Sequence, residues 1–119
     1  MSTRQEKVNE LLRAEISDII RRELNDPRVG FITVTGAEVS PDLKHAKVFV
    51  SVLGDETQKA QTMKALKSAT KFIRAEVARR VSMKSTPELL FMPDKSMETG
   101  IRMFELLEKI KKDDGGEGA

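Results

Sequence analysis

The sequence contains no cysteine, no tryptophan and no tyrosine, and it has a single histidine, His45. The absence of cysteine excludes disulfides and thiolate metal sites and favours a cytoplasmic protein. Phenylalanine is the only aromatic residue, with five copies, which argues against a surface that stacks several bases on aromatic rings. The chain has no apolar run of membrane-spanning length, and charges interrupt the N-terminal region where a signal peptide would lie. We therefore expect a cytoplasmic protein that does not contact membranes.

Residues that perform catalysis are equally scarce. His45 lies between Lys44 and Lys47 without a second histidine or a cysteine to share a metal or activate a nucleophile. The glycines before residue 115 are isolated, so no glycine-rich phosphate loop is present. The 19 acidic residues offer many pairs, but no spacing singles out one of them. We expect no catalytic residue, no metal, no cofactor and no small-molecule substrate, and hence not an enzyme.

Hydrophobic periodicity predicts one α+β domain with a mixed three-stranded sheet. The predicted elements, in chain order, are a helix over 4–24, strands over 31–39 and 44–53, a helical segment over 57–83, a strand over 88–92 and a helix over 97–111, with Ile101, Phe104, Leu107 and Ile110 on its inner side. The first two strands form an antiparallel hairpin, and the helical crossover to the third requires a parallel pair. Helices should cover one face of the sheet. Residues 1–112 are then one monomeric domain, followed by a disordered acidic tail over 113–119.

Charge is distributed very unevenly along the chain. Residues 59–84 hold eight basic residues and one acidic residue, Glu76, for a net charge of +7. The other residues, with 13 basic and 18 acidic side chains, carry −5, so the overall +2 conceals the asymmetry. Lys64, Lys67, Lys71 and Arg74 are spaced to lie along one helical face. A concentrated positive face of this kind is how a small protein binds a polyanion.

Three interpretations of this segment compete. A run of charge on a helix is usually a solvated face. The near absence of interleaved acids argues against this, because intrahelical ion pairs cannot explain the lysines. The remaining alternatives are a nucleic-acid-binding face and a protein-interaction module whose basic helices bind an acidic partner. Competition by RNA distinguishes these two, whereas salt dependence does not, since both are electrostatic.

The order of strands and helices resembles a KH domain, an RNA-binding module that clamps the nucleic-acid backbone with a GxxG loop between two helices. That loop is missing from the expected position. The one GxxG sequence, Gly115 to Gly118, lies in the C-terminal tail and has no flanking helices. The pattern therefore predicts a KH-like arrangement without the usual clamp.

Several segments resemble the ribosome-binding factor A family in sequence and in order, over residues 4–112. They are NDPRVG (25–30), VSPDLKHAKVFVSV (39–52), ALKSATKFIR (65–74) and PELLFMPDKS with ETGIRMFELL (87–107). The resemblance implies a type II KH-like fold of order α-β-β-α-(kink)-α-β-α, with an Ala-x-Gly kink in place of the GxxG loop. Ala69 and Thr70 fit this element, whereas Lys71 occupies the glycine position and leaves the sharpness of the kink open.

The resemblance also implies a function. Members of the family are bacterial assembly factors that bind the free small (30S) ribosomal subunit and support late maturation and processing of precursor 16S rRNA, including growth in the cold. The implied partners are the small subunit and its 16S rRNA. The candidate RNA-binding residues are Lys64, Lys67, Ser68, Ala69, Thr70, Lys71, Arg74, Arg79, Arg80 and Lys84.

Overall fold

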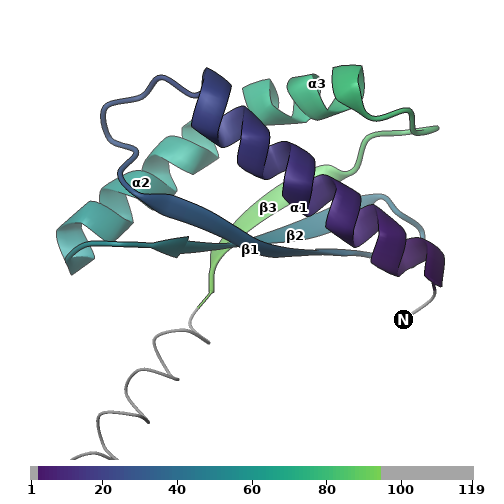
Figure 1. Ribbon diagram of the computed structural model, residues 1–119, viewed down its shortest axis with the longest axis horizontal. Coiled ribbons are helices and arrows are strands. Elements are labelled where there is room, and N and C mark those ends of the chain that lie inside the picture. Colours follow the sequence, from purple (N-terminus) through teal and green to yellow (C-terminus); the bar gives the residue numbers. More distant parts are fainter. Residues whose placement is uncertain (1–2, 95–119) are drawn as a thin grey trace, which may run out of the picture.

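The computed structural model describes residues 3–94, which form three helices and one three-stranded sheet (Figure 1). In chain order the elements are α1 (Thr3–Glu23), β1 (Ile32–Val39), β2 (His45–Val52), α2 (Glu56–Ser68), α3 (Thr70–Arg80) and β3 (Glu88–Pro93). The order predicted for a type II KH-like domain is confirmed over these residues. The predicted helix over 97–111 and tail over 113–119 lie outside the described residues, and so does the predicted domain boundary at residue 112.

The sheet is mixed, as predicted. Its strand order is β1-β2-β3, with β1 antiparallel to β2 and β2 parallel to β3. The register of the hairpin shifts between Val34, which pairs with Val50, and Gly36, which pairs with Phe49. Thr35 is the additional residue of this β-bulge, and a bulge of this kind increases the local twist of the strand. The parallel pair follows from the crossover through α2 and α3, which returns the chain to the far edge of β2.

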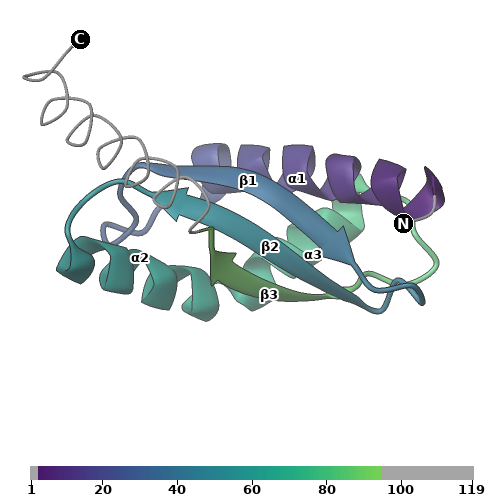
Figure 2. The same ribbon diagram turned by 90° about the horizontal axis from the view of Figure 1, so that it is seen from below.

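All three described helices lie on one face of the sheet, as Figures 1 and 2 show from two directions. Strand residues alternate between the faces, so Ala46, Val48 and Val50 of β2 are buried against the helices. Lys47 and Phe49 point to the opposite face. The described part of the chain is therefore a two-layer structure in which one sheet face is left uncovered.

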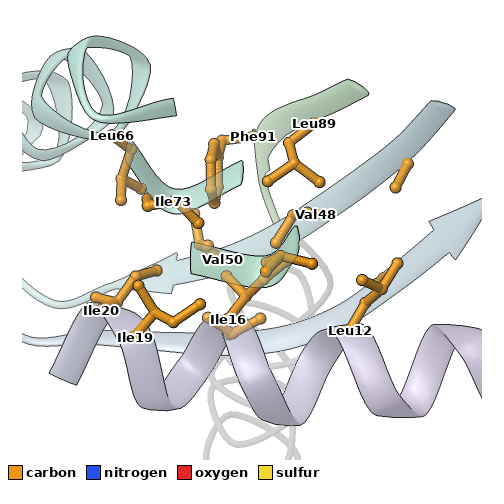
Figure 3. Close-up of a cluster of buried hydrophobic side chains, with 14 of the residues drawn as sticks. Leu12, Ile16, Ile19, Ile20, Val48, Val50, Leu66, Ile73, Leu89 and Phe91 are labelled. Atoms are coloured by element: carbon orange, nitrogen blue, oxygen red, sulfur yellow. The ribbon is translucent and has the colours of Figure 1, made fainter. Parts of the chain in front are cut away.

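The core lies between the helices and the sheet (Figure 3). Its fully buried side chains include Leu12, Ile16 and Ile19 of α1, and the neighbouring helices add Leu66 and Ile73. These positions recur at helical spacing, so they lie on the side of each helix that faces the sheet.

Leu11 and Phe72 lie at the margins of the buried helix faces, and each is 44% exposed. Each immediately precedes a fully buried neighbour, Leu12 or Ile73, at about 100° around the helix. A helix on one face of a sheet buries a limited arc, and these residues fall at its margin.

Candidate nucleic-acid interface

The second helix directs its lysines outward because its other side is used for packing and capping. Asp55 accepts a hydrogen bond from the backbone N–H of Gln58, whose side chain accepts one from the N–H of Asp55. This capping box defines the start of α2. Ala65 and Leu66 are then buried. The exposed side of α2 is left with Lys64 and Lys67.

The helical segment predicted over 57–83 is interrupted at Ala69, and its last three residues are not helical. Ala69 has φ −91° and ψ 1°, a bridge conformation that ends α2 and begins α3. Its N–H donates to the carbonyls of Ala65 and Leu66 at 2.9 and 3.1 Å, and its carbonyl accepts from Ile73 at 2.9 Å. The backbone hydrogen bonds therefore continue through the bend, and α2 and α3 point in different directions (Figure 1).

The bend does not require a glycine at position 71. Within residues 3–94, positive φ angles occur at Leu43 and Gly54, and neither lies near the bend. Lys71 is the second residue of α3 and has an ordinary helical position. The hydroxyl of Thr70 donates to the carbonyl of Leu66 at 2.9 Å and supports the turn from one helix to the next. The kink implied by the family resemblance is thus present, centred on Ala69.

Lys64, Lys67 and Lys71 are all exposed around this bend, and we call them the lysine stripe. None of the three forms a salt bridge within the part of the chain that the structure describes. Ser68, exposed between them, and Ala69 have small side chains that permit close approach to the backbone. The stripe therefore presents three cations whose charge is not cancelled by the surrounding acidic residues.

Arg74 is used differently, although the sequence places it on the same helical face. Its Nε and Nη2 atoms donate to the carbonyls of Pro87 and Thr86 at 3.1 and 2.7 Å, and Glu88 lies 3.6 Å away. The guanidinium thereby attaches α3 to the start of β3. A hollow beside it is lined by Thr70, Lys71, Arg74, Ala75, Ala78, Thr86 and Glu88. Arg74 thus borders the lysine stripe while its donors are engaged by the protein.

Arg79 and Arg80 are both paired with carboxylates. Arg79 contacts Glu76 at 2.7 Å, and Glu76 is buried. Arg80 contacts Glu15, Asp18 and Glu23 of α1 at 3.4, 2.7 and 3.0 Å. Three carboxylates around one guanidinium neutralise its field, and the hydrogen bond to Asp18 is the main cause that raises the pKa of Arg80 far above its ordinary value. Arg80 therefore joins α3 to α1, whereas Arg79 pairs within α3 and its side chain stays exposed.

Lys84 lies apart from the stripe. It is exposed in the loop between α3 and β3, at the end of the molecule away from α2 (Figures 1 and 2). There it lines a hollow together with Arg4, Asp42 and Lys44. The ten predicted residues therefore divide into a stripe at the bend with its small neighbours, three engaged arginines and one distant lysine.

Phe72 is a candidate that the sequence prediction missed. Its ring is 44% exposed next to Lys71. An exposed aromatic ring beside cations can stack on a base. Its position about 100° from the buried Ile73 was the available signal, but helical periodicity alone could not show that the apolar arc ends before it.

Replacing Arg80 with methionine is expected to lower stability and to change its acid dependence. Arg80 lowers the pKa of Asp18 below its ordinary 3.8, chiefly through their hydrogen bond. A lowered carboxyl pKa gives stability that is full above the unfolded-state value and is lost as pH falls through the folded one. The variant should therefore be less stable near neutral pH and lose less additional stability below about pH 4. Thermal unfolding across roughly pH 2–7 measures both effects.

Arg13→Met is the matched control, because Arg13 pairs with one exposed carboxylate, Glu10, inside its own helix. The stability of the Arg13→Met variant should change little. Equal unfolding midpoints and acid profiles for the two variants would contradict the structural role of Arg80.

Within residues 3–94, no group of three or more histidine or acidic side chains is arranged to hold a metal ion. No helix of that region combines the length and apolar character needed to cross a membrane.

Comparisons with known proteins agree on one family. A family model described as "Ribosome-binding factor A" matches residues 4–107. A protein of that name from Halothermothrix orenii is 54% identical over 111 residues, covering 93% of this chain and 91% of its own.

Solved structures give the same result. The crystal structure of ribosome-binding factor A from Thermus thermophilus has a TM-score of 0.70 at 28% identity, over 77% of this chain and 97% of that one. A homology model of the Thermus thermophilus protein, fitted into a cryo-EM map of its complex with the 30S subunit, has a TM-score of 0.62 at 30% identity, over 73% and 91%.

Proposed function

Because this chain belongs to the ribosome-binding factor A family, we propose that it binds the small ribosomal subunit and places its lysine stripe on phosphates of 16S rRNA. The observation that carries the proposal is the exposure of Lys64, Lys67 and Lys71, without acidic partners in the described residues, around the bend at Ala69. A related protein in complex with the 30S subunit supports the choice of partner.

The geometry favours recognition by shape. Lysines that contact phosphates provide affinity and orientation with little sequence discrimination. The bend places Lys64 and Lys67 on one helix and Lys71 on the next, so a curved RNA backbone suits the three ammonium groups better than a straight one. Small residues at the bend, Ser68 and Ala69, permit the RNA to approach. Lys84, on a different part of the surface, would make a separate contact.

The proposed role is to stabilise one conformation of the small subunit during its late maturation, while precursor 16S rRNA is processed. A ligand shifts a conformational equilibrium by as much as it prefers one state over the other, so binding alone suffices and catalysis by this chain is not required. RNA misfolding persists longer at low temperature, where a factor of this kind would contribute most to growth.

The rival interpretation is that the stripe binds an acidic protein. Sedimentation with purified small subunits, repeated with an excess of free 16S rRNA, distinguishes the two. We expect the protein to sediment with small subunits and to be displaced by the RNA, because the RNA presents the same phosphates. Large subunits are the control for general attraction to ribosomal RNA.

Two outcomes would contradict the proposal. Failure to sediment with small subunits at low salt would exclude the partner. Sedimentation that excess 16S rRNA leaves unchanged would instead assign the contact to a ribosomal protein.

A further inference from the structure

The sheet face opposite the helices carries an unexpected number of large apolar side chains. Phe31 is 81% exposed, Leu53 75% and Leu90 52%. Strand alternation places Phe49 and Met92 on the same face, since their neighbours Val48, Val50 and Phe91 are buried in the core. We call Phe31, Phe49, Leu53, Leu90 and Met92 the apolar band. Several large apolar residues on one exposed face mark a contact surface more often than a single one does.

The register of the strands makes these residues neighbours. Phe49 of β2 is paired with Met92 of β3, and Leu90 lies beside Lys47 in the adjacent pair on this face. At the other end of β2, Leu53 donates its N–H to the carbonyl of Phe31 at 3.0 Å. The apolar band therefore has two parts on one sheet face: Phe49, Leu90 and Met92 on β2 and β3, and Phe31 with Leu53 at the far end of β2, with the Thr33–Ser51 pair between them.

The chain leaves the sheet on this same face. The N–H of Asp94 donates to the carbonyl of Val50 at 2.7 Å, which extends the pairing beyond β3. Its carboxylate accepts a hydrogen bond from the hydroxyl of Thr35, the bulge residue, at 2.6 Å. Figure 1 shows the end of β3 directed away from the helices. Asp94, the last described residue, thus lies at the edge of the apolar band.

We propose that residues 97–110 bind the apolar band as a helix and cover the second face of the sheet. Their sequence predicts an amphipathic helix with Ile101, Phe104, Leu107 and Ile110 on one side. A helix of that length spans about 20 Å, comparable with the roughly 26 Å of an eight-residue strand. Only two residues separate it from Asp94, so it is tethered close to this face. The proposal concerns the sheet, not the lysine stripe, and stands apart from the proposed function.

Hydrogen exchange of the full-length chain tests the docking. The amides of residues 98–110 should exchange at least about tenfold more slowly than in an unstructured chain. Leu90→Glu places a charge at the β3 end of the apolar band and should abolish that protection. Phe72→Glu is the matched control, because Phe72 is similarly exposed but lies on the helical side, and it should leave the protection intact. The protection of β2 shows that both variants remain folded.

Cysteine cross-linking provides an independent measurement, because the natural chain has no cysteine. Leu90→Cys combined with Phe104→Cys or Leu107→Cys should form an intramolecular disulfide in at least one pair. Phe72→Cys combined with the same partners should cross-link about tenfold more slowly or less, since the tether alone supplies only a general effective concentration.

Three results would overturn the proposal. The amides of 98–110 could exchange as fast as in an unstructured chain, which would mean that this segment does not bind the apolar band. Their protection could persist in Leu90→Glu, which would place the segment elsewhere. Protection or cross-linking could instead depend on protein concentration and yield dimers, which would identify a second copy of the chain as the occupant.

Discussion

Replacing Lys64, Lys67 and Lys71 together with glutamate is expected to weaken binding to the small ribosomal subunit by roughly a hundredfold or more at about 0.1 M monovalent salt. Each lysine that neutralises a phosphate releases counterions, so losing three such contacts should flatten the plot of log K against log salt by roughly 2–3 units. Sedimentation at several salt concentrations gives both the affinity and the slope. The variant should remain folded, because all three side chains are exposed.

The matched control is Arg4→Glu with Lys7→Glu and Lys44→Glu. It changes the net charge equally and uses exposed side chains. Arg4 and Lys7 belong to the start of α1 and Lys44 precedes β2, and these parts of the two elements lie at the end of the molecule away from α2 (Figure 1). A modest loss through the general field is expected, without a change of slope of the same size. If the control loses as much affinity and slope as the stripe variant, the lysine stripe is not a specific RNA contact.

Shortening Ile73 to alanine is expected to destabilise the protein by about 2–5 kcal/mol. Ile73 is fully buried, and Figure 3 shows it among Leu66, Val50 and Phe91 in the core. The loss combines the transfer of the removed atoms with the cost of the cavity that they leave. Denaturant unfolding measures the effect as a shift of the midpoint at unchanged slope. The protein that remains folded should bind the small subunit as before, because Lys71 is unaltered.

Phe72→Ala is the control for this prediction. Phe72 precedes Ile73 but is 44% exposed, so truncating its larger side chain should cost about 1 kcal/mol or less. Similar losses in the two variants would mean that α3 is rotated relative to the orientation described above.

The elements and the sheet were predictable because their signals are local. One side of each element is buried. Apolar residues therefore recur every two residues along the strand over 44–53 and every 3.6 residues along the helix over 4–24. The bounds agreed within one or two residues for every described element except the crossover. In the crossover the backbone hydrogen bonds continue through Ala69. The bend therefore needs neither proline nor glycine, and the sequence carries no residue that marks it.

The number of basic residues in 59–84 could be read from the sequence, but not which of them pair with other parts of the protein. Arg80 differs from Lys71 in that its three partners, Glu15, Asp18 and Glu23, lie 57–65 residues earlier in the chain. Arg74 likewise binds the carbonyls of Thr86 and Pro87. No spacing within 59–84 reveals these pairings, because they form where α3 meets α1 and where it meets the start of β3.

The sequence by itself therefore determined an α+β chain with a KH-like order, a strongly basic helical segment and the family to which it belongs. Only the tertiary structure decided that Lys64, Lys67 and Lys71 remain available while Arg74 and Arg80 are engaged, and that an apolar band lies on the sheet face opposite the helices. The physical reason is the distance along the chain between the residues involved. Periodicity and net charge are properties of neighbours in sequence, whereas neutralisation and exposure depend on side chains that folding brings together.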